Sequence, residues 1–180
     1  MNSGTLDLQQ VTTPDAVTPE LRHALIDCWI EVTNAGGAAG FPFPPIGADQ
    51  AGPAVDALVA DLDPRTSRFL VASVDGHLVG WLNVRRALHP LTAHWGTVHH
   101  VQTRTTVRGR GIGVALMNRL REIAREEMGL EALHLAARGG VGLEDFYGRL
   151  GWKEIGRWPD ALRLAPGDDR DEVLMLLAPL

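Results

Sequence analysis

The sequence predicts an α/β fold in which a mixed, mostly antiparallel sheet carries helices on both faces. Two apolar runs joined by Asp75-Gly76 have the composition of a tight β-hairpin. A glycine-rich segment at 107–113 separates an apolar strand-like run from an amphipathic helical run. Beyond residue 130 the chain alternates short strands with a short helix. This order places helices against a sheet, and we expect one domain over residues 1–180.

The N-terminal third is predicted to form a strand, two helices and an irregular loop. Residues 5–11 have the pattern of a short strand. Thr18 provides an N-cap and is followed by a proline and an acid, so a helix is expected from there to about residue 33. Residues 36–47 hold four glycines and three prolines and cannot form regular structure. A second helix is expected near residues 53–62.

The rest of the chain is predicted to form the remaining strands and helices. The hairpin joins strands at 69–74 and 78–84, and another strand is expected at 97–103. The helix that follows the glycine-rich segment should end near Met128, with Gly129 as its cap, since its apolar residues have helical spacing: Ile112, Leu116, Leu120 and Ile123. We then expect a strand at 132–136, a helix at 143–150 closed by Gly151, and strands at 152–155 and 172–177.

Composition excludes several classes of function. The net charge of −5 argues against nucleic acid as a partner, since such surfaces concentrate positive charge. Cys28 is the single cysteine, so no intramolecular disulfide can form, and its helix-like surroundings favour a buried structural thiol. No apolar run has the length of a membrane span, and residues 1–10 lack the pattern of a signal peptide. We therefore expect a cytoplasmic protein that does not bind membranes.

The glycine-rich segment carries the strongest chemical signal. Glycines before a helix let the backbone approach a ligand, and the free amides of the first helical turn favour a phosphate. A dinucleotide loop would need a third glycine where Val114 stands, and a P-loop would need a lysine, but the single lysine is Lys153. A turn with packing duties alone is the remaining alternative.

Arg108, Gly111 and Gly113 match the acetyl-CoA loop of the GNAT superfamily, and the chain resembles this superfamily along most of its length. Residues 146–152, with Tyr147 followed by Gly151 and an aromatic residue, resemble a second motif of the same family. Two family positions differ, because Thr105 replaces a proline and Gly140 replaces an asparagine. The segment 156–175 is similar to small-molecule acetyltransferases near the tabtoxin-resistance type.

The resemblance implies an N-acetyltransferase with acetyl-CoA as co-substrate and no metal. The backbone around Val101, Gln102 and Thr103 would donate hydrogen bonds to the thioester carbonyl. The loop that would hold the coenzyme A phosphates comprises Arg108, Gly109, Arg110, Gly111, Ile112 and Gly113, and Arg104 is a further candidate for phosphate contact.

Acetyl transfer to an amine needs an acid for the departing thiolate and a way to deprotonate the amine. Tyr147, the single tyrosine, stands where the family places the acid, although it could be core packing instead. His99 and His100 occupy the strand segment where the family often has a base, and neutral imidazole accepts protons near pH 7. Strand alternation predicts that these two side chains point to opposite faces. Either histidine could be structural, and a metal site is disfavoured because no third ligand is evident.

The acceptor is predicted to be the amine of a small molecule, whether antibiotic, toxin or metabolite. Trp29, Phe41, Phe43 and Trp158 are expected to line its pocket, although they could equally be core residues. A protein or peptide amine is the alternative within the fold, and the acidic residues Asp168, Asp169 and Asp171 would suit it. A non-catalytic module that binds acetyl-CoA is the third possibility. The protein could be a monomer or a homodimer.

Overall fold

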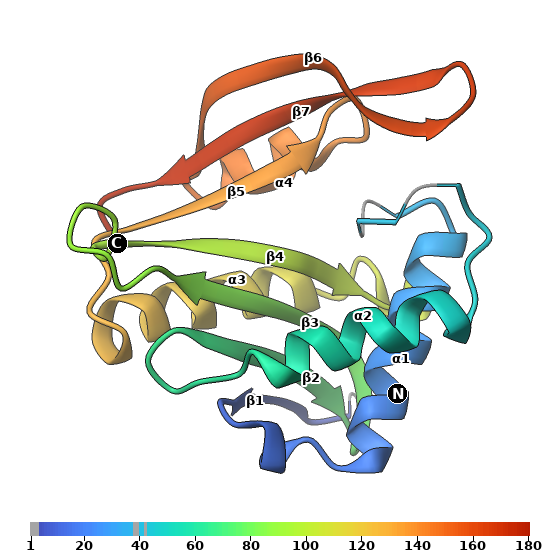
Figure 1. The fold of residues 1–180 in the computed structure, drawn as a ribbon, viewed down its shortest axis with the longest axis horizontal. Helices are drawn as coiled ribbons and strands as arrows, with labels where there is room; N and C mark the ends of the chain where they lie inside the picture. The colour runs from blue at the N-terminus through green and yellow to red at the C-terminus, as the bar shows by residue number, and fades with distance from the viewer. Residues whose placement is uncertain (1–3, 38–39, 42) are drawn as a thin grey trace.

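The computed structural model describes residues 4–37, 40–41 and 43–180. In this part of the chain seven strands form one sheet in the order β1-β2-β3-β4-β5-β7-β6 (Figure 1). Their bounds are β1 (Leu6–Val11), β2 (Ser67–Val74), β3 (His77–Arg86), β4 (Trp95–Thr103), β5 (Ala132–Arg138), β6 (Lys153–Ala165) and β7 (Asp168–Leu177). Neighbouring strands are antiparallel except for β4 and β5, which are parallel. The predicted mixed, mostly antiparallel sheet is confirmed.

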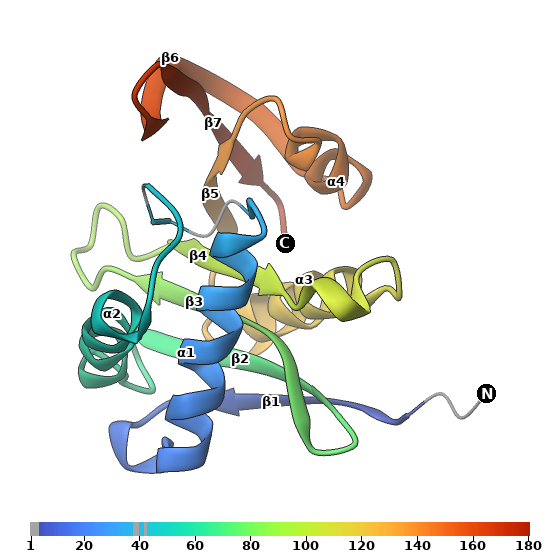
Figure 2. The same cartoon turned by 90° about the vertical axis from the view of Figure 1, so that its right-hand side faces the viewer.

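Helices cover both faces of this sheet, as predicted. Their bounds are α1 (Pro19–Asn34), α2 (Ala48–Ala60), α3 (Ile112–Glu122), which continues into a π-type turn at Ile123–Glu127, and α4 (Leu143–Arg149). Figure 2 shows α2 on one side of the sheet and α3 and α4 on the other. Helices α1 and α2 pack on Phe69 and Trp81, whereas α3 packs on Leu70 and Leu82, which are their strand neighbours and point the opposite way. The two cores therefore share one sheet.

Local chemistry sets the boundaries that the sequence predicts well. The α1 helix begins where predicted, because the Thr18 Oγ1 accepts a hydrogen bond of 3.1 Å from the Leu21 N–H. The turn between β2 and β3 has φ of 50° at Asp75 and 79° at Gly76, as the tight hairpin requires. Gly129, with φ of 64°, lies just beyond the π-type turn.

The second helix begins earlier than predicted. We expected Pro53 near the helix start, because proline lacks the N–H that an interior residue donates. In the structure α2 begins at Ala48 and contains Pro53. Its first turn is closed by the Gln50 side chain, whose Oε1 accepts a hydrogen bond of 3.1 Å from the Gly47 N–H. Pro53 then costs the helix a single backbone hydrogen bond.

The last two strands are longer than predicted. Pro159 and Asp160 disfavour a strand, but β6 passes through them with a register shift between Trp158 and Leu162. Strand β6 lies at the sheet edge, where a proline and a bulge are tolerated. Asp160 has φ of 54° within this irregularity. Long-range pairing with β7 therefore overrides the local sequence preference.

Candidate functional site

Strands β4 and β5 separate in the middle of the sheet. They pair at Trp95, Gly96 and Thr97 alone, and beyond this point they diverge (Figure 1). The residues that follow on each strand line a cavity of about 640 Å³, with Val101–Thr103 on one side and Leu135–Arg138 on the other. This places the predicted residues Val101, Gln102 and Thr103 at a wall of the cavity.

The glycine-rich loop forms another wall of the same cavity. Gly109 and Gly111 have φ of 76° and 79°, and a Cβ atom at either position would meet no atom within 4 Å. The first helical hydrogen bond runs from the Ala115 N–H to the Gly111 carbonyl, at 2.9 Å. The amides of residues 112–114 therefore lack backbone acceptors, and they lie at the cavity. Open space, free amides and the positive end of a helix dipole suit the phosphates of a coenzyme.

Gly113 has a different role from the other two loop glycines. A Cβ atom there would lie 3.3 Å from the Phe146 ring. This glycine lets α4 approach the start of α3, and so it helps to bring Tyr147 beside the loop.

The three arginines near the loop are not equivalent. Arg108 and Arg110 are exposed, and neither forms an ion pair within the described residues, so both charges can face a phosphate. Arg104 is engaged elsewhere, since its guanidinium lies 2.6 Å from the Glu31 carboxylate and 2.8 Å from the Leu78 carbonyl. The expectation that Arg104 contacts phosphate is therefore wrong for this arrangement.

Glu31 is a residue that the sequence analysis missed. Its Oε1 accepts hydrogen bonds of 2.8 Å from both the N–H and the Oγ1 of Thr105, which stands at the family's proline position. Burial raises the pKa of Glu31, but the hydrogen bonds from Thr105 and Arg104 outweigh it, so the pKa lies below its usual value. This network ties the end of α1 to the segment that leads into the glycine-rich loop.

Tyr147 lies in the wall of the 640 Å³ cavity and is almost fully buried. Its ring packs against Phe146 and Trp152, with centroid separations of 5.1 and 5.9 Å. Within the described residues its hydroxyl has no hydrogen-bond partner. Burial raises its pKa above the usual value, so the phenol stays protonated at neutral pH. A protonated donor in a cavity wall suits a general acid.

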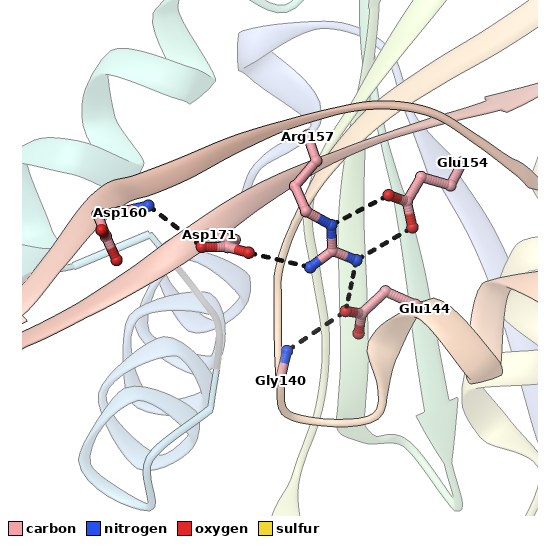
Figure 3. A network of polar contacts seen from close by, with 6 residues as sticks. All are labelled: Gly140, Glu144, Glu154, Arg157, Asp160 and Asp171. Carbon is pink, nitrogen blue, oxygen red and sulfur yellow. Dashed lines mark hydrogen bonds and ion pairs between the residues drawn. The ribbon is translucent and has the colours of Figure 1, made fainter.

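A charged cluster holds the helix that carries Tyr147. Arg157 on β6 contacts Glu154, Asp171 and Glu144, at nitrogen–oxygen distances of 3.0, 3.1 and 3.4 Å (Figure 3). The Glu144 carboxylate also accepts a hydrogen bond of 3.3 Å from the Gly140 N–H. The hydrogen bonds that Arg157 donates to the Glu154 and Asp171 carboxylates raise the pKa of Arg157. The cluster joins β6 and β7 to the first turn of α4.

His99 and His100 do not point to opposite faces. His100 has φ of 57°, and the pairing of β3 with β4 shifts register between Trp81 and Asn83, so strand alternation is broken here. Both rings line a second cavity of about 510 Å³, and His100 alone also lines the first. Burial lowers the pKa of His99, and nearby Arg85 lowers it further.

The predicted aromatic residues have three different environments. Trp29 is buried, and its ring lies 4.8 Å from that of Phe41 and 4.6 Å from that of His100. Phe41 and His100 line the second cavity, so Trp29 supports this wall from behind. Phe43 is 53% exposed and is bound through its backbone, whose N–H donates to the Leu164 carbonyl at 2.9 Å.

Trp158 does not line either cavity. Its side chain is 67% exposed on edge strand β6, and the nearby residues Leu162 and Leu164 line the second cavity in its place. The residues that follow Trp158 on β6 do line the second cavity, and the register shift after Trp158 changes which side chains face it. Leu162 and Leu164 could be found only from the register in which β6 pairs with β7, because this register decides which side chains face the cavity. The aromatic character of Trp158 does not indicate it.

Residues that could suggest other functions have structural roles. Asp168, Asp169 and Asp171 are paired with Arg170, Arg163 and Arg157, respectively, so they do not form an uncompensated acidic groove. Within residues 4–37, 40–41 and 43–180, no cluster of histidine, cysteine and acidic side chains could hold a metal ion. In the same residues, every helix is too short or too polar to cross a lipid bilayer.

Comparison with known proteins places this geometry in context. Residues 20–152 match the Acetyltransferase (GNAT) family. A GCN5-related N-acetyltransferase from Kribbella flavida has a TM-score of 0.76 and 22% identity, over 97% of this chain and 98% of that one. An aminoglycoside 6'-N-acetyltransferase complexed with coenzyme A has a TM-score of 0.70 and 17% identity, over 96% of each chain. The ribosomal-protein-alanine N-acetyltransferase from Brucella melitensis has a TM-score of 0.73 and 19% identity, over 96% of this chain and 99% of that one.

Proposed function

The chain belongs to the GNAT acetyltransferase family, whose members use acetyl-CoA, and on this premise we propose that it acetylates the amine of a small molecule by direct attack. The observation that carries the proposal is the contact between the two cavities. Both are lined by Val98, His100, Ala136 and Arg138, at the point where β4 and β5 diverge. Acetyl-CoA would occupy the cavity beside the glycine-rich loop, and the acceptor would enter from the other.

The residues of the first cavity fit acetyl-CoA. Arg108 and the amides of 112–114, which line the cavity, would hold the phosphates together with Arg110, which is exposed on the same loop. Amides of Val101–Thr103 would donate to the thioester carbonyl and stabilise the negative charge that develops on its oxygen. Gly109 and Gly111 leave room for the coenzyme, since a Cβ atom at either position would project into open space.

The reaction balances with the groups that line the junction. The amine arrives as an ammonium ion and gives one proton to a base, for which His100 is the nearer candidate because it lines both cavities. The neutral nitrogen then forms a bond to the acetyl carbon, and the carbon–sulfur bond breaks. Tyr147 gives its proton to the departing thiolate, and the phenol is restored by the proton that the amine nitrogen still carries in excess. The products are the N-acetyl compound, coenzyme A and the proton taken up by the base, which the base then releases to solvent.

Two features support a small acceptor over a protein. The segment 156–175 resembles that of small-molecule acetyltransferases near the tabtoxin-resistance type. The acidic residues expected to favour a peptide are already paired with arginines of the same hairpin. A peptide acceptor is the competing activity, since a neighbour in the comparison acts, by its name, on a ribosomal protein.

The experiment that tests the proposal is turnover of acetyl-CoA with a panel of small amines and, separately, a panel of peptides with free N-termini. Release of coenzyme A and the mass of the product are measured together. Acetylation of small amines alone would support the proposal, and acetylation of peptides alone would replace it with the competing activity. Binding of acetyl-CoA by calorimetry without turnover of either panel would indicate a non-catalytic module.

A further inference from the structure

The second cavity contains two opposite charges that do not pair with each other. Arg138 at the end of β5 lies directly across the strand pair from Glu172 on β7, and both line this cavity. Side chains at such positions lie on the same face of the sheet. Neither of the two forms an ion pair with any described residue, and the undescribed positions 1–3, 38–39 and 42 carry no carboxylate in the sequence.

Arg138 is surrounded by groups that do not neutralise it. Its one hydrogen bond among the described residues, from Nη1 to the Gly36 carbonyl, is long at 3.5 Å. Burial lowers the pKa of Arg138, and the neighbouring Arg170 lowers it further. Asp168 acts in the opposite direction, but its carboxylate accepts a hydrogen bond of 2.5 Å from Arg170. A partly buried guanidinium without a counter-ion is unfavourable, and a bound carboxylate would relieve this cost.

Besides the candidate base His100, three other titratable groups line this cavity, namely Arg163, His99 and His134. Arg163 makes two hydrogen bonds of 2.7 Å to the Asp169 carboxylate. Burial lowers the pKa of both His99 and His134, so both are neutral at pH 7. Among the described residues, Arg138 therefore supplies this cavity with a positive charge that has no ion-pair partner, and Glu172 supplies a negative charge that has none.

The position of Arg138 determines where a bound anion would lie relative to the two cavities. It is one of the four residues shared by the two cavities, and its Nη1 lies 3.5 Å from the carbonyl of Gly36, which lines the first cavity. An anion held there would lie beside the amine that attacks. The planar guanidinium binds a carboxylate through two parallel hydrogen bonds, which fixes orientation as well as position.

We propose that the acceptor is a small amino acid whose carboxylate binds Arg138 next to the acetyl-transfer junction. Glu172 attracts the ammonium group of the incoming zwitterion before the amine loses its proton. The remaining lining includes Phe41, Leu162 and Leu164, so the side chain of the amino acid is apolar. This inference rests on the proposed function and specifies its substrate class.

The test compares matched acceptors that differ at the carboxylate. We would use L-leucine, L-methionine and L-phenylalanine, each with its carboxamide and its decarboxylated amine. The expected kcat/KM is at least about tenfold higher for each acid than for its amide, a factor that corresponds to about 1.4 kcal/mol. The amide has the less basic amine and presents more of the neutral nucleophile, so intrinsic reactivity alone predicts the reverse order.

Substitution of Arg138 separates this role from others. In Arg138→Gln the ratio of kcat/KM for the acid to that for its amide is expected to fall to about 1 or below, since intrinsic reactivity favours the amide. Arg138→Lys should restore part of the ratio, because it keeps the charge but not the two parallel hydrogen bonds. Arg65→Gln removes an exposed arginine that lines neither cavity and is the matched control for loss of one positive charge. Calorimetry with L-leucine in the presence of coenzyme A gives a readout independent of turnover, and binding should weaken in Arg138→Gln alone.

The outcomes distinguish this inference from the proposed function. Amides or decarboxylated amines that match or exceed the acids would overturn the amino-acid acceptor while leaving small-amine acetylation intact. A loss of acetyl-CoA affinity in Arg138→Gln would also overturn it, by assigning the guanidinium to the coenzyme. Acetylation of peptides and of no small amine would overturn both proposals.

Discussion

The rings of His99 and His100 lie 5.8 Å apart and line one cavity, although adjacent residues of a regular strand point to opposite faces. The positive φ of His100 and the register shift beside it turn both side chains toward the second cavity. The strand irregularity thus places two imidazoles at this cavity, and His100 also lines the cavity beside the glycine-rich loop.

We predict that one histidine accepts the proton of the amine. A base works in its neutral form, so kcat/KM should rise with pH through the pKa of that group. If His99 is the base, the rise should lie below pH 6.5, since burial lowers its pKa. Profiles measured for wild type, His99→Ala and His100→Ala, with two acceptors of different amine pKa, would identify the residue. If the rise in kcat/KM shifts with the pKa of the acceptor amine and persists in both histidine variants, a histidine base is excluded.

We predict that stability decreases as the solution is acidified through the range of the unfolded histidines. The pKa values of His99 and His134 are lowered in the folded protein, so below about pH 6.5 the unfolded chain binds more protons. The free energy of unfolding should fall by at most about 1.4 kcal/mol per pH unit for each group, less where solvent screens it. Urea unfolding at about pH 7 and about pH 5 measures this, and His134→Gln should reduce the difference. If the free energy of unfolding changed equally between the two pH values in wild type and in His134→Gln, the contribution assigned to His134 would be contradicted.

We predict that Gly111→Val raises the dissociation constant of acetyl-CoA at least about tenfold. The side chain would enter the space in front of the loop and would strain a residue whose φ is 79°. Gly76→Val is the matched control, because Gly76 has the same φ and the same open surroundings but lies in the β2–β3 turn. Calorimetry that gives equal affinities for the two folded variants would reject the loop as the phosphate site.

We predict that Tyr147→Phe lowers kcat by about 10²-fold and leaves folding and acetyl-CoA affinity nearly unchanged. The substitution removes the proton donor, and the hydroxyl has no hydrogen-bond partner among the described residues that would be lost. Single-turnover kinetics isolate the chemical step, and the melting temperature checks the fold. Full activity in a chemistry-limited assay would reduce Tyr147 to a packing residue.

We predict that Arg157→Ala loosens the helix that carries Tyr147. The loss of the contacts to Glu144 and Asp171 should speed hydrogen exchange in residues 143–149 and lower kcat. The expected decrease in kcat is smaller than the factor of about 10² that a 1 Å misplacement of a catalytic group can cause.

The control for this change is Arg22→Ala, which removes the exposed ion pair with Asp56 between α1 and α2. It should leave exchange in α4 unchanged. Arg157→Lys should recover part of kcat, since one charged contact can be kept. Exchange in α4 that is the same in Arg157→Ala as in wild type would refute the positioning role.

The sequence by itself determined the fold class, the tight hairpin, the glycine-rich loop before α3 and the placement of Tyr147 on a short helix. These features depend on local chemistry, namely caps, turn glycines and helical spacing, which act over a few residues. The family motifs also lie within such segments, so Arg108, Gly111 and Tyr147 could be identified before any contact was known.

The tertiary structure decided which side chains share a cavity. The register shift in β4 put His99 and His100 on one face, and the shift in β6 moved Trp158 out of the pocket and Leu162 into it. Arg138 and Glu172 became neighbours through pairing of β5 with β7, across a sequence separation that no local pattern encodes. Strand register follows from long-range packing, and a shift of one residue reverses the face of every side chain that follows.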